Sequence, residues 1–80
     1  MSEHKEGMSL GAQRVRESFN PSKDNTVDKI KRYTADLIDL CEELRGQFPE
    51  RGEAARLIAL AQTTYEEAAM WGVKAATTPK

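Results

Sequence analysis

Two long segments of the chain carry apolar side chains at helical spacing on more than one side, and this surplus of apolar surface limits the possible folds most. The first segment runs from about Thr26 to Arg45. Its apolar or small residues recur at intervals of three and four, the period of one helix face: Val27, Ile30, Thr34, Leu37, Cys41 and Leu44. Tyr33, Ile38 and Leu40 widen this stripe, so we expect the helix to contact more than one neighbouring helix.

The second predicted helix begins between Glu50 and Ala54 and ends near Ala76. It is rich in alanine, which favours helix propagation and close packing. Its apolar residues also lie on more than one side: Leu57, Ile58, Leu60, Ala61, Tyr65, Ala68, Ala69, Trp71 and Val73. Gly72 inside this helix costs about 1 kcal/mol relative to alanine. Such a cost predicts either a close approach by another backbone or a helix that loosens near its end.

The connection between the two predicted helices is short, at residues 47–52, and Gly46 before it is a good residue to end the first helix. Two helices joined in this way form an antiparallel hairpin. A chain of 80 residues makes one domain, and a hairpin alone would leave broad apolar faces in water. The sequence therefore predicts an all-α fold, an antiparallel two-helix hairpin with an N-terminal arm that assembles into a closed homo-oligomer.

The domain is expected to occupy residues 13–76, between a flexible tail at 1–12 and a short tail at 77–80. Within it, residues 13–18 fit either a short helical turn or an extended arm. Residues 19–25 are expected to form a loop, because Pro21 disfavours helical geometry at the residue before it.

Composition excludes several classes of protein. No apolar run approaches the roughly 20 residues that span a bilayer, and the N-terminus lacks the hydrophobic stretch of a secretory signal. We therefore expect no membrane partner and a cytoplasmic location. The single cysteine, Cys41, cannot form a disulfide within the chain. With His4 as the only histidine, a zinc site within one protomer lacks a complete ligand set, and we expect no metal and no cofactor.

Residues able to carry out catalysis are scarce. His4 lies in the expected tail, and Cys41 lies on an apolar stripe, where a buried and unreactive thiol is expected. The adjacent acids Glu66 and Glu67 point about 100° apart on a helix, so we expect structural ion pairs from them rather than a paired-carboxylate site. No glycine loop of phosphate-binding spacing is present. We therefore expect a binding protein and not an enzyme.

The basic residues are concentrated in one part of the chain, although the net charge is −1. Residues 11–32 contain six basic and three acidic residues, a net charge of +3, whereas residues 33–80 contain five basic and eight acidic residues, a net charge of −3. Long nucleic acid requires a stronger basic surplus, so we expect no partner of that kind. A local basic patch suits a small anionic ligand, and a solvated charged surface is the competing interpretation.

Four residues have the chemistry of a nucleotide or phosphate site. Phe19 can stack on a base, and Lys31, among other basic residues, can neutralise phosphate. Arg56 lies in the first turns of the second helix, where backbone amides add positive potential, and Thr63 offers a hydroxyl about two turns later. Structural alternatives exist, since Phe19 could pack the arm onto the hairpin and Arg56 could be an ordinary surface residue.

A larger set of residues, spread over about 14–76, forms a familiar pattern: Phe19–Ser22, Val27–Lys31, Ala35–Asp39, Arg56, Leu60–Ala61, Thr63 and Glu66–Trp71. Its most specific part is the run Tyr65–Trp71, preceded at a fixed distance by Arg56. This pattern resembles the helical-hairpin family of anti-CBASS cyclic nucleotide sponges. The same hairpin is similar to the helical part of certain anti-Thoeris sponges.

The resemblance implies a phage-encoded protein that acts in the cytoplasm of an infected bacterial host. Members of this family bind the cyclic nucleotide signals of CBASS defence without cleaving them, which keeps the killing effectors inactive. The family forms a hexamer with cyclic dinucleotide sites between protomers and separate cyclic trinucleotide sites where three protomers meet. The expected partners are therefore cyclic dinucleotides such as cyclic GMP-AMP, cyclic trinucleotides such as cyclic tri-adenylate, and further copies of the chain in a homohexamer.

The resemblance also implies residues of the cyclic dinucleotide site. The family's aromatic residue in the N-terminal arm, which stacks on a base, falls on Phe19. Many members have tyrosine there, so a hydroxyl contact is absent from this chain. The family's basic residue on the first helix, which meets phosphate, falls on Lys31, and Asn20 and Thr34 are further expected contacts.

The cyclic trinucleotide site is expected to contain Arg56, onto which the family's arginine at the start of the second helix falls, together with Thr63. Outside the resemblance, a second function stays open. The chain could be a helical protein–protein interaction module, such as an antitoxin-like or assembly protein, whose apolar faces receive a foreign helix. A monomer or dimer that binds no nucleotide would favour this alternative.

Overall fold

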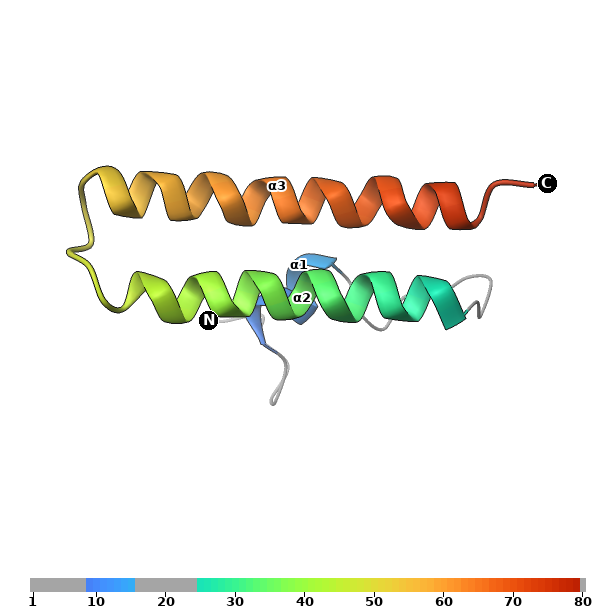
Figure 1. The fold of residues 1–80 in the computed structure, drawn as a ribbon, viewed down its shortest axis with the longest axis horizontal. Helices are drawn as coiled ribbons and strands as arrows, with labels where there is room; N and C mark the ends of the chain where they lie inside the picture. Colours follow the sequence, from blue (N-terminus) through green and yellow to red (C-terminus); the bar gives the residue numbers. More distant parts are fainter. Residues whose placement is uncertain (1–8, 16–24, 80) are drawn as a thin grey trace, which may run out of the picture.

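The computed structural model describes residues 9–15 and 25–79, and within them the chain forms three helices and no strand. Helix α1 spans Leu10–Val15, α2 spans Asn25–Arg45 and α3 spans Glu53–Ala76. α2 and α3 lie antiparallel and side by side, joined at one end, and α1 packs against α2 near its middle (Figure 1). The predicted all-α fold and antiparallel hairpin are confirmed.

The two long helices begin and end close to the positions that the apolar pattern predicts. α2 ends directly before Gly46, whose N–H donates to the Glu43 carbonyl at 3.1 Å and so tightens the last turn. Gly46 does not use the left-handed conformation that often ends a helix. Among the described glycines, only Gly52 has a positive φ, of 119°, and it precedes the first residue of α3.

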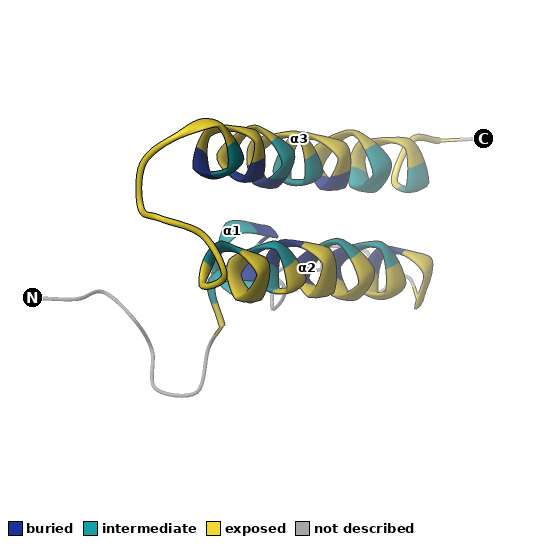
Figure 2. Cartoon of the chain, turned by 60° about the vertical axis from the view of Figure 1, so that its left-hand side comes forward, coloured by how far each residue is buried: buried dark blue, intermediate teal, exposed yellow. Residues whose placement is uncertain are grey.

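The core of the hairpin lies between the facing surfaces of α2 and α3 (Figure 2). Its buried apolar residues are small or β-branched, which allows the helices to pack closely: Val27, Ala35, Ile38, Ala55, Ile58 and Ala69. Val15 of α1 joins the same core, with Leu10 packed against it. The short helix is therefore part of the folded domain.

Helix α1 begins inside the segment 1–12 that was expected to be a flexible tail, since Leu10, Gly11 and Ala12 are helical, while residues 1–8 lie outside the described residues. The Ser9 hydroxyl accepts a hydrogen bond from the Ala12 N–H at 3.0 Å, which supports the start of the helix. Leu10 contributes apolar burial that a solvated tail would lack. Of the two conformations left open for residues 13–18, the helical one is found for residues 13–15.

The close backbone approach that Gly72 led us to expect occurs instead at Gly11. A Cβ atom at Gly11 would overlap the backbone carbonyl of Ala35, so α1 can lie on α2 only with glycine at this position. A Cβ atom at Gly72 would meet the Ile30 side chain, with 3.2 Å to its Cγ2. The neighbour that packs closely on Gly72 is therefore the side chain of Ile30 and not a backbone. The helix does not end at Gly72, because α3 continues to Ala76.

Large apolar side chains remain on the surface of the single chain. Tyr33, Leu37, Leu40 and Leu44 recur at spacings of four, three and four along α2, and each is 39–59% exposed. On α3, Leu57, Leu60, Met70 and Trp71 are each at least 50% exposed. None of the helices in the described part of the chain combines the length and the apolar character needed to cross a bilayer.

Candidate functional site

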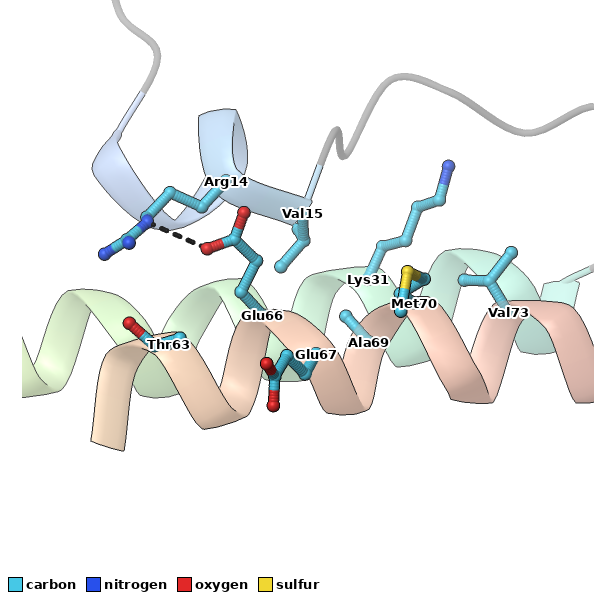
Figure 3. Close-up of a pocket in the computed structure, with 9 residues that line it drawn as sticks. All are labelled: Arg14, Val15, Lys31, Thr63, Glu66, Glu67, Ala69, Met70 and Val73. Atoms are coloured by element: carbon cyan, nitrogen blue, oxygen red, sulfur yellow. Dashed lines mark ion pairs between the residues drawn. The ribbon is translucent and has the colours of Figure 1, made fainter. Parts of the chain in front are cut away.

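A pocket of about 550 Å³ lies where the three helices meet, a volume within the usual range for small-molecule sites. α1 contributes Arg14 and Val15, and α2 contributes Lys31 (Figure 3). One side of α3 supplies the remaining wall. Its pocket residues follow one another within about three helical turns: Thr63, Glu66, Glu67, Ala69, Met70 and Val73. The pocket thus combines two cations, two acids and an apolar surface.

Lys31 is the most unusual residue of this pocket, because it lies on the buried face of α2. Val27 and Ala35, one turn before and one turn after it, are core residues, and Lys31 itself is only 2% exposed. Its side chain rises from α2 beside Val15, with the amino end directed away from the helix (Figure 3). Removing an ammonium group from water is unfavourable, so a lysine is an unusual residue for this buried helix face. The ammonium group carries three hydrogen-bond donors and no acceptor, which suits phosphate.

Arg14 forms the second positive group of the pocket wall. Its Nε lies 3.3 Å from the Glu66 Oε1 atom, and both side chains are partly exposed, at 31% and 43%. The pair joins α1 to α3 across the pocket (Figure 3). Of the two adjacent acids for which structural ion pairs were expected, Glu66 forms one, here with the chain's own Arg14. The terminal nitrogens of a guanidinium carry further N–H groups, so Arg14 has the chemistry to bind an oxyanion as well.

Two of the four residues expected in the dinucleotide site, Phe19 and Asn20, lie outside the described residues. Thr34 is described, and it does not line the pocket. Its hydroxyl donates to the Ile30 carbonyl at 2.6 Å, with the Lys31 carbonyl 3.2 Å away. This bond turns the hydroxyl proton back to α2, so Thr34 can offer a ligand only its acceptor lone pairs.

The two residues expected in the trinucleotide site are separated in the single chain. Thr63 is exposed and lines the pocket, together with Lys31. Arg56 does not line it. Because the two residues are seven positions apart on α3, they lie on the same side of the helix and about 10 Å apart along its axis.

Arg56 is an exposed residue of the first turn of α3, and it pairs with Glu53 through two contacts. Its Nη2 lies 2.6 Å from Glu53 Oε2, and its Nε lies 3.1 Å from Glu53 Oε1. The hydrogen bonds that Arg56 donates to this carboxylate raise the pKa of Arg56 above its ordinary value. A partner that binds Arg56 through its fork must therefore displace Glu53 or approach beside it.

Besides Val15, Glu66 and Ala69, four pocket residues were not anticipated as ligand contacts: Arg14, Glu67, Met70 and Val73. The last three lie on one side of α3 with Thr63, and their helical spacing is visible in the sequence. Arg14 gave no such signal, because its place in the pocket depends on how α1 docks on the hairpin.

The described residues that line the pocket include no histidine and no cysteine. No group of three or more His, Cys, Asp or Glu side chains within residues 9–15 and 25–79 could hold a metal ion. Cys41 does not line the pocket, and it is half-buried rather than fully buried as expected.

Comparison with known proteins places this hairpin in a family. The family model Acb2/Tad1, hairpin domain, matches residues 11–77, which takes in α2, α3 and all of α1 except its first residue. No curated protein and no solved structure matches the chain. Because the match covers most of its length, the protein belongs to the Acb2/Tad1 hairpin family, the family of anti-CBASS and anti-Thoeris sponges.

Proposed function

We propose that the protein binds cyclic di- and trinucleotide immune signals and sequesters them without cleaving them, so that the effectors of CBASS defence are not activated. Membership of the family supports this activity, since Acb2/Tad1 proteins are associated with sponge-like binding of cyclic nucleotides. For this chain, the observation that carries the proposal is Lys31, a cation that is 2% exposed in a pocket of ligand size.

The charges of the pocket suggest how a cyclic nucleotide would lie in it. Lys31 on α2 and Arg14 on α1 can each neutralise a phosphate. Glu66 and Glu67 on α3 would repel phosphates, and their oxygens can accept hydrogen bonds from base N–H groups. We therefore place the phosphates towards α1 and α2 and the bases along α3.

The apolar part of the wall suits the flat faces of bases. Val15, Met70 and Val73 line the pocket beside the charged residues. The methionine side chain is flexible and polarizable, so it can adapt to bases of different shape. Such a wall favours binding of several cyclic nucleotides rather than strict selection of one.

The full set of contacts in this proposal is larger than the pocket of one chain. Lys31 holds the cyclic dinucleotide with Phe19, Asn20 and Thr34. Arg56 and Thr63 hold the cyclic trinucleotide. Because Arg56 is exposed at the start of α3, away from the pocket, its site would be completed by neighbouring copies of the chain.

A homohexamer is part of the proposal. The single chain exposes apolar surface on both long helices, which is unfavourable in water. This surface consists of the exposed apolar residues of α3 and of the α2 stripe Tyr33, Leu37, Leu40 and Leu44. Burial of these faces between copies would complete the core, and a closed symmetric assembly is the common way to do so. We further propose that the protein is encoded by a phage and acts in the cytoplasm of the infected host.

The test is a binding experiment that also examines the fate of the ligand. Cyclic GMP-AMP and cyclic tri-adenylate are titrated into the protein in a calorimeter, with the linear dinucleotide as the negative control. The protein is then denatured, and the released ligand is analysed by chromatography. We expect tight binding and recovery of the intact ring. Consumption of the ring, or no binding of either ligand, would contradict the proposal.

Lys31→Ala tests the pocket directly, with Lys29→Ala as the matched control, since Lys29 is an exposed lysine two positions away on the same helix. Loss of a charge-assisted contact is expected to weaken cyclic dinucleotide binding by about tenfold or more, while the control binds as the wild type does. Equal affinities for both variants and the wild type would show that Lys31 does not hold the ligand.

The exposed apolar faces also support a second candidate, a helical protein–protein interaction module. Such a module would receive a foreign amphipathic helix on the α2 stripe. The same experiment separates the two, because the module binds no cyclic nucleotide and is monomeric or dimeric before its partner arrives.

A further inference from the structure

The short helix α1 is held on the hairpin by contacts that lie outside the pocket. The Gly11 N–H donates a hydrogen bond of 2.7 Å to the Asp39 carboxylate of α2, Oδ1 being the acceptor. At the same place the Gly11 backbone lies so close to Ala35 that a Cβ atom would overlap the Ala35 carbonyl. Neither Gly11 nor Asp39 lines the pocket.

This attachment decides where two pocket residues lie. Arg14 and Val15 follow Gly11 by three and four residues, so they lie one helical turn further along the same side of α1. Gly11 faces α2, and Arg14 and Val15 therefore lie next to the hairpin as well, where they form one wall of the pocket (Figure 3). If α1 moved away from α2, that wall would be lost.

Helix α1 cannot keep its conformation without these contacts. It has six residues, whereas isolated helices shorter than about 12 residues are marginal in water. The first amides of a helix lack partners within the helix, and Asp39 supplies one to Gly11. A carboxylate near the start of a helix is also favoured by the helix dipole.

We propose that Asp39 and Gly11 are positioning residues for the ligand. They hold α1 on α2 so that Arg14 and Val15 form the pocket wall, and affinity for a cyclic nucleotide depends on them although neither touches it. This inference rests on the proposed function of the pocket.

The experiment compares four variants of the full chain. Asp39→Ala removes the acceptor, Asp39→Asn keeps a neutral acceptor, and Gly11→Ala forces the overlap with Ala35. Asp36→Ala is the matched control, since Asp36 is an exposed aspartate one turn earlier on α2. Each variant is titrated with cyclic GMP-AMP, and hydrogen–deuterium exchange is measured for residues 10–15 and for α2 and α3.

We expect faster exchange in residues 10–15 of Asp39→Ala and Gly11→Ala, with α2 and α3 protected as in the wild type. The affinity of both variants should fall by about tenfold or more, because each releases the α1 wall of the pocket and with it the contacts of Arg14 and Val15. Asp39→Asn should recover most of this loss, and Asp36→Ala should bind normally. If Asp39 acted only through its negative charge, the affinity of Asp39→Asn would be as low as that of Asp39→Ala.

Two results would overturn the inference while leaving the proposed function intact. In the first, exchange in α1 rises but affinity stays within twofold of the wild type. In the second, affinity falls while exchange in α1 is unchanged, so that Asp39 acts in another way. If the wild type itself binds no cyclic nucleotide, the proposed function fails, and the positioning role fails with it.

Discussion

Arg45 and Gln62 connect α2 to α3 through a hydrogen bond of 2.7 Å from the guanidinium Nη2 to the amide oxygen. The Gln62 side chain is 1% exposed, and its Nε2 donates to the Ile38 carbonyl at 3.1 Å and to Glu42 at 2.9 Å. Both polar atoms of this buried amide therefore have partners on α2. A shift of α3 along α2 would remove them, so the network fixes the register of the hairpin.

Replacement of Gln62 by leucine should destabilise the protein. The leucine fills a similar volume, but Arg45 and Glu42 lose their partner on α3, and we expect the free energy of unfolding to fall by about 1–3 kcal/mol. Urea denaturation at one fixed protein concentration measures this, because any self-association adds to apparent stability. Thr64→Ala, an exposed change on the same helix, is the control. An equal effect of the two substitutions would rule out a register-fixing role for Gln62.

The same network should make stability depend on pH through Glu42. The hydrogen bond from Gln62, aided by Arg45, holds the pKa of the Glu42 carboxyl below its ordinary value of 4.5, against the opposing effect of burial. A lowered folded-state pKa stabilises the protein above the ordinary value, and this contribution is lost as the pH falls through the lowered pKa.

Thermal unfolding at pH 7 and at steps down to pH 3 tests this with Glu42→Gln as the comparison. We expect the wild type to be more stable than Glu42→Gln at pH 7. The difference should be small because the Glu42 side chain is 48% exposed, and it should vanish at the acid end of the range. A margin that is constant over the whole range would show that ionisation of Glu42 does not contribute.

Much of the fold could be predicted because its signals are local. The spacing of Val27, Ile30 and Leu37 in one segment and of Leu57 and Leu60 in the other places the two long helices, which the structure finds at Asn25–Arg45 and Glu53–Ala76. Helix α1 could not be predicted in full. Gly11 in a polar stretch indicates a flexible chain, and its real role depends on the Ala35 backbone, which only the folded structure brings to it.

The candidate site also contains one residue that the sequence could predict and one that it could not. Lys31 could be selected as a basic residue, and its burial follows from its place one turn from Val27 and from Ala35 on the core face. Arg14 could not be selected, because nothing in its neighbourhood along the chain indicates that it meets Glu66. That contact joins residues of α1 and α3, and it exists only because α1 docks on α2.

Arg14 should matter for binding and little for stability. A partly exposed ion pair such as Arg14–Glu66 contributes at most about 1 kcal/mol, so Arg14→Ala should unfold at nearly the wild-type temperature. Its affinity for cyclic GMP-AMP should nevertheless fall, and the salt dependence of binding should become weaker because one phosphate contact is lost. Glu66→Gln provides the opposite test, since it removes a negative charge from the pocket and should bind at least as tightly as the wild type. Weaker binding by both variants would assign the pair a structural role instead.

Arg56 should separate the two classes of ligand. It lies outside the pocket that contains Lys31, so Arg56→Ala should weaken cyclic tri-adenylate binding and leave cyclic GMP-AMP binding unchanged. Glu53→Gln releases the Arg56 fork from its carboxylate and should keep or raise affinity for the trinucleotide. Calorimetry with both ligands on each variant measures these changes. Equal losses for the two ligands would mean that Arg56 does not distinguish them.

The exposed α2 stripe should control assembly. Leu40 is 59% exposed in the single chain, in line with Tyr33, Leu37 and Leu44. If copies of the chain bury this stripe, Leu40→Glu places a carboxylate in an apolar interface, where an unpaired charge is strongly unfavourable, and the oligomer should dissociate. Glu43→Lys changes the charge of an exposed α2 residue outside the stripe and should leave the assembly intact. Light scattering after size-exclusion chromatography gives the mass of each variant. An oligomer of unchanged mass in Leu40→Glu would place the interface elsewhere, and a monomeric wild type would remove the basis for ligand sites shared between copies.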